Sequence, residues 1–552
     1  MPNTNAQRVY DLLHRMPTEG LNAAKRLFWT ELNYDRAADP LSTRDWPEAT
    51  RALLAAAPTL LAQHSATLGN FDIVYIPLAS EQTGRSFPLS LAAERAVIAQ
   101  LLPDHPYALF VFSDAAEKHW QLVNVKYRRD KADGESAARR VLRRIAIGPY
   151  ERLRTAAERV AMLDLTTLSP KLADGGHPSS LSPIAIQQRH DDAFDVEAVT
   201  KAFFTTYREH FERVEARITG LAAGDAESDA EGVRIFTQRL FNRLLFIIFL
   251  ERKGWLIPPD VGKPIRSDGY LAALWDAHRH PSFHSGQVPS FHSGQVPSLY
   301  SERHSERSEE SQHSDEPNFY RDRLKLLFFS GLNNPGSIDI TGIKADGPLA
   351  ALIGRVPYLN GGLFEKEHLD EREDIVVPDA VFGPLFDDLL YHYNFTVTES
   401  TPLDVEVAVD PEMLGKIFEE LVTGRHESGS YYTPKPVVAF MCREALKGYL
   451  HDACPREPAD AIAAFVEERD AADIRQPEAV LTALRGVKVC DLACGSGAYL
   501  LGMLHELMEL RQALFVSRHL DARSAYERKL EIIQNSLYGV DIDPFADNIA
   551  RV

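Results

Sequence analysis

Short runs of apolar residues in the first third of the chain predict β-strands. Three of them are FDIVYIPL (71–78), YALFVFS (107–113) and WQLVNVKY (120–127), and all are rich in β-branched and aromatic side chains that suit a sheet. The third run is predicted to pair with the second, and basic helices are predicted to follow it. Residues 1–165 are therefore predicted to form a mixed α/β domain.

The pattern changes twice in the middle of the chain. Residues 166–193 are rich in Pro, Gly, Ser and Asp without a regular period, which is typical of a linker. Residues 194–425 are predicted to be helical, with a core helix over Val233–Lys253 that ends at Gly254. Inside this region, residues 282–315 repeat the octapeptide SFHSGQVP and contain few aliphatic side chains, which predicts a disordered insertion.

The last part of the chain has a strand–helix–strand pattern. VKVCD (487–491) predicts a short buried strand, SGAYLLGMLHELMEL (496–510) an amphipathic helix, and SLYGVD (536–541) a second strand. This order is that of a βαβ unit opened by a glycine turn. Residues 426–552 are therefore predicted to be a third domain, and the predicted fold class is α/β plus α.

Composition excludes several classes of protein. With 45% hydrophobic and 25% charged residues among 552, the chain has the composition of folded soluble domains. No apolar stretch approaches the roughly 18 residues that span a bilayer, and the N-terminus lacks a secretory pattern, so we predict a cytoplasmic protein without membrane contact. The four cysteines suit neither a disulfide framework nor a zinc site, and no metal is predicted. They are Cys442, Cys454, Cys490 and Cys494.

The net charge of −19 argues against a protein that coats nucleic acid through its overall charge. A basic segment over residues 126–159 still offers a local surface for a phosphate backbone. The candidates for contact with DNA are Lys126, Arg139, Arg140, Arg143, Arg144, Arg152 and Arg154. A solvated face of an acidic protein explains the same segment equally well.

A turn in the last domain is the strongest candidate for a ligand site. It reads DLACGSG (491–497), and Gly495 and Gly497 would let the backbone approach a ligand closely. Leu500 stands where the third glycine of a dinucleotide fingerprint would fall, which disfavours NAD. Asp491 would repel a pyrophosphate, but it suits a ligand with positive groups such as S-adenosylmethionine.

Two further elements fit the same ligand. Asp541 ends the second predicted strand, where it can accept hydrogen bonds from both ribose hydroxyls, and Ile542 would lie against the adenine. Upstream, Thr433 and Pro434 are predicted as the N-cap and first residue of a helix whose N-terminus could hold a carboxylate. The predicted packed face of that helix consists of Val437, Val438, Phe440 and Met441. Each residue alone suits an ordinary loop or core position, but their joint placement favours a cofactor site.

Three segments together resemble the cofactor half of the large adenine-specific DNA methyltransferases found in type IIG restriction–modification enzymes and related phage-defence methylases. They are GSYYTPKPVVAFM, VCDLACGSGAYLL and LYGVDIDPFADNIA. Their order, with the carboxylate-binding helix before the glycine turn, matches the γ arrangement of that family. The resemblance covers most of the chain from about Phe194, because FNRLLFIIFLERKGWL and VPYLNGGLF look like its helical region.

The resemblance implies an incomplete Rossmann-like class I methyltransferase domain that binds S-adenosylmethionine and acts on the N6 amino group of adenine in double-stranded DNA. It implies that Thr433 and Pro434 border the methionine carboxylate. The other residues implied to contact the cofactor are Asp491, Ala493, Gly495, Gly497, Asp541 and Ile542.

The loop that would hold the flipped adenine in this family is an Asn/Asp-Pro-Pro-aromatic motif. No such motif occurs in the sequence, so no catalytic residue is assigned. We therefore expect a fragment, truncated after the second strand and inactive alone. A truncated gene, a disrupted gene or one half of a split system with a separately encoded C-terminal half would each give such a fragment. The alternative is a non-catalytic DNA- or partner-binding fragment with a partial cofactor cleft.

The family resemblance also raises the question of a nuclease in residues 1–165. A metal-dependent nuclease of the PD-(D/E)xK kind needs an acid on one strand and Glu-x-Lys on the next, because two carboxylates hold the metal ion. The chain offers Asp72 or Asp114, followed by Asn124-Val125-Lys126, where the second acid is an amide. A degenerate nuclease-like domain, or one that binds the DNA backbone, is therefore preferred to an active nuclease.

Overall fold

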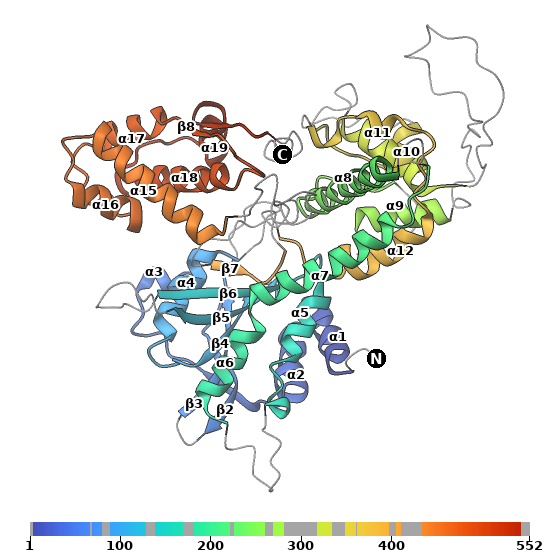
Figure 1. Ribbon diagram of the computed structural model, residues 1–552. Helices are drawn as coiled ribbons and strands as arrows, with labels where there is room; N and C mark the ends of the chain where they lie inside the picture. The colour runs from blue at the N-terminus through green and yellow to red at the C-terminus, as the bar shows by residue number, and fades with distance from the viewer. Residues whose placement is uncertain are drawn as a thin grey trace, which may run out of the picture.

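The computed structural model describes most of the chain (Figure 1). The described residues are 4–66, 69–79, 89–128, 139–168, 181–220, 226–259, 269–280, 317–333, 348–359, 362–396, 404–409 and 433–542. The predicted disordered insertion at 282–315 lies outside these ranges. None of the helices within them is long and apolar enough to cross a membrane.

A seven-stranded mixed sheet forms the centre of the N-terminal region. In spatial order its strands are β1 (Asp35–Pro40), β2 (Thr59–Ala66), β3 (Gly69–Leu78), β4 (Ala108–Asp114), β5 (Trp120–Arg128), β6 (Arg139–Ile147) and β7 (Asp404–Glu406). The β3–β4 and β6–β7 pairs are parallel, and the other pairs are antiparallel. The three strands predicted from apolar runs are confirmed as β3, β4 and β5, including the pairing of β5 with β4.

The basic helices predicted after β5 are wrong in part. Residues Arg139–Ile147 form strand β6, which pairs with β5 along its whole length. Successive side chains of a strand point to opposite faces of the sheet, so Arg143 and Ile145 lie on one face and Leu142 and Arg144 on the other. The pairing with β5 fixes this register. A helix does follow, because α5 spans Leu153–Ala161.

Helices cover both faces of the sheet (Figure 1). On one face, α4 (Leu91–Leu101) packs Val97 and Ile98 into a cluster with Ile76 and Phe112. On the other face lie α1 (Thr4–Glu19), α2 (Leu21–Arg26), α5 and α6 (Pro183–Ala193), whose apolar residues join a larger cluster. Because β4 is buried along its whole length, it reads as a continuous apolar run.

Part of the predicted linker is folded. Residues 183–193 form α6, and the Ser182 side chain accepts a hydrogen bond from the Ala185 amide at 3.2 Å, with Pro183 at the first helical position. The Ser-Pro pair was the available signal for a helix start. The remaining stretch, 169–180, lies outside the described residues.

The helical region follows α6. Its elements are α7 (Val196–Glu215), α8 (Ala226–Arg252), α9 (Tyr270–Arg279), α10 (Pro348–Ile353), α11 (His368–Glu371), α12 (Phe382–Leu385) and the short segments η5 (Tyr320–Leu324), η6 (Leu326–Leu332), η8 (Gly362–Phe364), η9 (Asp379–Val381) and η10 (Phe386–Leu390). The predicted core helix is confirmed as α8, and Gly254 follows it in the left-handed conformation, at φ 70°.

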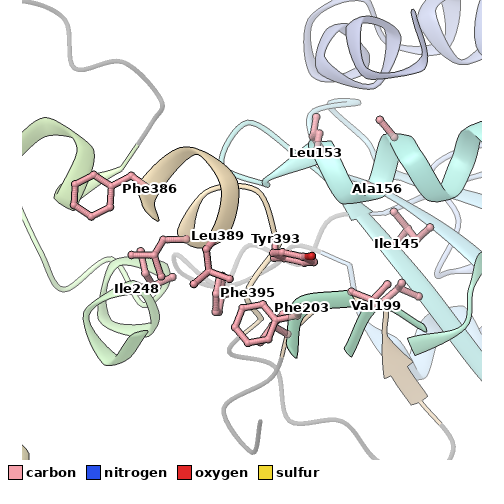
Figure 2. Packing of buried hydrophobic residues seen from close by; sticks show 14 of the residues in the cluster. Ile145, Leu153, Ala156, Val199, Phe203, Ile248, Phe386, Leu389, Tyr393 and Phe395 are labelled. Atoms are coloured by element: carbon pink, nitrogen blue, oxygen red, sulfur yellow. The ribbon is translucent and has the colours of Figure 1, made fainter. Parts of the chain in front are cut away.

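One hydrophobic core joins the sheet to the helical region. Ile145 of β6, Phe203 of α7, Ile248 of α8 and Phe395 belong to one buried cluster, part of which is drawn in Figure 2. Strand β7 adds to this continuity, because it comes after the helical elements in the chain and pairs with β6. The boundary predicted between residues 165 and 194 is therefore not a break in packing.

The C-terminal unit has its own core. It contains α15 (Lys435–Ala453), α16 (Ala459–Glu468), α17 (Pro477–Gly486), β8 (Val489–Asp491), α18 (Ala498–Arg518), α19 (Ala525–Asn535) and β9 (Leu537–Gly539). Leu450, Phe465, Leu484, Leu507 and Leu510 are among its buried residues, and none of them joins the cluster around the large sheet.

Candidate functional site

The predicted strand–turn–helix–strand unit is confirmed. Strands β8 and β9 are parallel neighbours, with Cys490 opposite Tyr538 and Asp491 opposite Gly539. Helix α18 begins directly after the glycine turn, and α19 is an additional helix before β9. The turn and the end of β9 therefore lie at the same edge of this small sheet, as a βαβ ligand site requires.

The glycine turn depends on its two glycines. Gly495 has φ 52° and Gly497 has φ 90°, both in the left-handed region where a side chain is strained. The Gly497 amide donates to the Cys494 carbonyl at 2.8 Å and closes the turn before α18 begins at Ala498. Because neither glycine has a Cβ atom, a ligand can approach the backbone of the turn closely at these two positions.

Two acids border the turn. Asp541 Oδ2 accepts a hydrogen bond from the Gly495 amide at 2.7 Å, so the residue after β9 holds the turn after β8. Asp491 Oδ1 accepts from the Ala493 amide at 3.2 Å, while Asp491 Oδ2 is buried without a hydrogen-bond partner. A buried carboxylate oxygen without a partner costs about 1–3 kcal/mol, and a donor on a bound ligand would remove that cost.

The other predicted cofactor residues lie around the same turn. Ala493 is exposed, and Ile542 is 93% exposed at the end of the described chain. Thr433 and Pro434 precede α15, whose N-cap is Pro434 and not Thr433, because Pro434 has an extended ψ of 140° and the helix begins at Lys435. The predicted cap is therefore wrong by one residue.

The predicted packed face of α15 is also wrong in part. Val438 is buried, as predicted, and the face continues through Cys442, Leu446 and Leu450. The side chains of Val437, Phe440 and Met441 are instead 46%, 63% and 48% exposed. An apolar run at a helix start does not tell which of its sides is covered, since that depends on where α18 packs.

Helix α15 packs closely on α18 beside the turn. A Cβ atom added at Gly502 of α18 would lie 2.3 Å from Val438 Cγ1, so any larger residue there would force one of the two helices or the Val438 side chain to shift. The Tyr499 hydroxyl also lies 3.1 Å from Met441 Sδ. The structure thus brings the start of α15 together with the glycine turn, although some 60 residues separate them in the sequence.

We expect Gly502→Ala to destabilise the C-terminal unit by about 1–3 kcal/mol, because the added methyl group collides with Val438 in a packed interface. The matched control is Gly448→Ala in α15, where an added Cβ meets nothing within 4 Å. That change should stabilise by about 0.5–1 kcal/mol, through helix propensity alone. Urea unfolding of both variants measures the difference, and equal effects would contradict the assigned packing.

The predicted nuclease residues are not brought together. Ile73 pairs with Leu109, which pairs with Asn124, so these three side chains share one face of the sheet. Asp72 is next to Ile73 and therefore lies on the opposite face, where its Oδ2 is 2.7 Å from His105 Nδ1. Asp114 caps its own turn, accepting from the Lys118 amide at 2.7 Å. In the described parts of the chain, no group of three or more His, Cys, Asp or Glu residues could hold a metal ion.

Asn124 instead belongs to a hydrogen-bonded network with α6. Its Nδ2 donates to Asp191 Oδ1 at 2.8 Å, and Gln187 Nε2 donates to Asn124 Oδ1 at 2.9 Å. Gln187 Nε2 also lies 3.2 Å from Asp191 Oδ1. The amide in place of the expected acid therefore fixes α6 against the sheet, a role that sequence reasoning missed because it placed α6 in a linker.

Replacing Asn124 with aspartate should lower stability at pH 7.5 by about 1–3 kcal/mol, since a carboxylate oxygen would take the place of the Nδ2 that donates to Asp191 Oδ1. The pKa of one of the two carboxyls would be raised, so the loss should shrink as the pH falls towards 5. Gln188→Glu, at an exposed position of the same helix, is the control and should change little. Thermal unfolding at both pH values tests this, and an equal loss at both would refute the repulsion.

Three of the seven predicted DNA-contacting residues are engaged inside the protein. Arg144 is 4% exposed and its Nε lies 2.7 Å from Glu94 Oε2. Arg143 pairs with Asp195 at 3.2 Å, and Arg152 pairs with Glu251 at 2.9 Å. Burial raises the pKa of Glu94 and of Glu251, while the facing arginine in each pair lowers it.

The rest of the basic segment is more open. Arg140 is exposed, Lys126 is partly exposed, and Arg154 donates to the Asp387 carbonyl at 3.3 Å. Nothing is described of the Arg139 side chain. The seven residues therefore do not form one surface, because the strand alternation of β6 sends Arg143 and Arg144 to opposite faces and each finds a carboxylate there.

Comparisons with known proteins give one curated relative and one solved structure. Over 336 residues the chain is 29% identical to a Methanocaldococcus jannaschii protein described as a "putative type II restriction enzyme and methyltransferase". The match covers 57% of this chain and 24% of the relative, so the chain spans about a quarter of that protein's length. No protein-family model matches.

The solved structure is that of the type IIL restriction–modification enzyme MmeI in complex with DNA. The identity is 16% and the TM-score is 0.32, over 64% of this chain and 35% of the other.

Proposed function

We propose that this chain is the cofactor-binding part of a restriction–modification or phage-defence DNA methyltransferase, and that its C-terminal unit binds S-adenosylmethionine. The similarity to the M. jannaschii protein supports the general class. The type IIG kind and the specificity for adenine N6 rest on the resemblance of the three motifs around Thr433, Gly495 and Asp541. The alternative remains a non-catalytic fragment that binds DNA or a partner protein.

The observation that carries the cofactor proposal is the buried, unpartnered Oδ2 of Asp491 beside a turn of two left-handed glycines. A carboxylate there favours a ligand with a positive group and disfavours a pyrophosphate. S-adenosylmethionine carries an ammonium and a sulfonium group, and the sulfonium makes its methyl group transferable. The carboxylate acceptors of the site therefore fit this cofactor better than a dinucleotide.

In this proposal each element holds one part of the cofactor. Asp491 accepts hydrogen bonds from the ammonium group, while the backbone at Gly495 and Gly497 passes close to the amino acid part. Asp541 accepts from the ribose hydroxyls and also holds the Gly495 amide, which orients the turn. Thr433 and Pro434 border the carboxylate, Ala493 lines the turn, and Ile542 lies against the adenine.

We further propose that double-stranded DNA is the substrate and that methyl transfer needs residues outside these 552, on the same polypeptide or on a separately encoded C-terminal half. No Asn/Asp-Pro-Pro-aromatic motif is present to hold a flipped adenine. Arg140 and Arg154 are exposed and Lys126 is partly exposed, and we propose these three members of the basic segment for contact with phosphate.

Calorimetric titration of the full chain with S-adenosylmethionine tests the cofactor proposal. We expect saturable binding of S-adenosylmethionine and none of NAD at the same concentration. Binding of NAD alone would overturn the assignment of the ligand. Binding of neither, by a chain whose cooperative unfolding shows that it is folded, would favour the non-catalytic alternative.

A further inference from the structure

The short strand β7 is held on the sheet by few backbone hydrogen bonds. Its three residues pair with Leu142–Arg144 of β6, and the Val407 amide donates to the Arg144 carbonyl at 2.8 Å. Behind it, the Thr396 amide donates to the Val409 carbonyl at 2.9 Å, and the Val409 amide to the Asn394 carbonyl at 2.8 Å. A strand of this length at a sheet edge depends on its side chains for stability.

The side chain of Glu406 lies where the sheet meets the helical region, between strand β6 and the segment around Thr396; we call this place the joint. Its Oε2 accepts a hydrogen bond from the Thr396 hydroxyl at 2.6 Å, and its Oε1 is buried without a partner. Figure 2 shows the surroundings of this joint, with Tyr393 and Phe395 beside Phe203 of α7. One carboxyl oxygen is thus held and the other is removed from water.

The charged groups that act on Glu406 come from three elements. They are Glu151, before α5; Arg252, on α8; and Arg144, on β6. Both arginines already bind other carboxylates, Arg252 with Glu151 at 2.6 Å and Arg144 with Glu94 at 2.7 Å. The neighbouring Glu151 carboxylate therefore acts on Glu406 as a like charge.

We propose that Glu406 is a proton-operated latch, which holds segment 404–409 on the edge of the sheet when its carboxyl is neutral and loosens it when the carboxyl is charged. Among the described residues the site offers one hydroxyl donor, and the two nearby arginines are bound to other carboxylates, so protonation removes a poorly compensated charge. Strand β7 is the last element of the sheet before the chain reaches the C-terminal unit. The protonation state of Glu406 therefore determines how strongly the segment that leads to this unit is bound to the sheet.

The direction of the pH dependence follows from the two states. Burial and the Glu151 charge raise the pKa of Glu406 from 4.5 to about 7, against the opposing effects of Thr396 and the two arginines. A released segment would titrate near the ordinary value, so docking takes up a proton between these two values. Docking should therefore weaken about tenfold between pH 6 and pH 8, and change little above pH 8.

Hydrogen exchange of the full chain, corrected for the intrinsic rate at each pH, measures the docking. We expect the protection of the Val407 and Val409 amides to fall about tenfold from pH 6 to pH 8 in the wild type. In Glu406→Gln, which is neutral at every pH, protection should be equal at both. Glu48→Gln, at an exposed position of the short helix α3 (Glu48–Arg51), should behave as the wild type.

Protection that is equal at both pH values in the wild type, or a tenfold fall that persists in Glu406→Gln, would overturn the latch. If Glu406→Gln leaves the segment unprotected at both pH values, the wild-type carboxyl is titrated directly by carbon-13 NMR of labelled glutamate, with the signal assigned by its loss in the variant. A midpoint near pH 7 supports the proposal, and a midpoint below pH 5 refutes it.

Discussion

Replacing Asp541 with alanine is expected to weaken binding of S-adenosylmethionine by at least about a hundredfold. The change removes the acceptors proposed for the ribose hydroxyls and the observed bond from the Gly495 amide at 2.7 Å. Hydrogen bonds to a charged group contribute about 1.5–3 kcal/mol each, so losing two of them accounts for this factor. Calorimetric titration of the variant against the wild type gives the two dissociation constants.

The matched control for this change is Asp473→Ala, at an exposed position in the same C-terminal unit, where affinity should be unchanged. Thermal unfolding of Asp541→Ala distinguishes a lost contact from a lost fold, because the acid lies at the end of the described chain and outside the buried cluster of this unit. An unchanged dissociation constant in a folded variant would remove Asp541 from the adenosine end of the site.

The second large effect is expected from Asp370→Asn in the helical region. Asp370 binds Arg243 of α8 through both oxygens, at 2.7 and 2.9 Å, and the two side chains are 1% and 3% exposed. Arg243 also donates to the Leu363 carbonyl at 2.9 Å and so holds the short helix η8. Removing one charge leaves the other buried, which costs about 3–5 kcal/mol.

Urea unfolding measures this loss, and the exposed pair of Asp276 with Arg279 provides the comparison. Both of those side chains are 51% exposed, so Asp276→Asn should cost no more than about 1 kcal/mol. A loss for Asp370→Asn as small as that of the control would mean that water or another group compensates Arg243. The double change Asp370→Leu with Arg243→Met should recover much of the stability, since it leaves no buried charge.

The local sequence pattern was sufficient to predict elements whose structure is determined by residues close together in the chain. The apolar runs of β3, β4 and β5, the all-round apolar helix α8 and the glycine turn at 495–497 were all predicted, because each carries its own signal in a short window. The grouping of Asp491, Gly495 and Asp541 followed from the βαβ order alone. Their role in binding a cofactor stays a prediction.

The local sequence pattern was insufficient where a residue far away in the chain determines the secondary structure or the exposure of a side chain. The arginines of β6 predicted a basic helix, but pairing with β5 makes a strand of them and brings Arg144 to Glu94. Asp72 and Asn124 looked like two halves of one site until the register placed them on opposite faces. In α15, the exposure of Phe440 depends on the position of α18, and the spacing of apolar residues within α15 does not indicate that position.

The late position of β7 in the chain has a consequence for synthesis on the ribosome. Its partner β6 ends at Ile147, whereas β7 begins at Asp404, so the sheet remains one strand short while the whole helical region is being made. At about 5–20 residues per second, this interval lasts on the order of ten seconds to a minute. During that time the backbone groups of Leu142–Arg144 form an open edge to which other nascent chains can add, and the arginines of β6 disfavour such an addition through their charge.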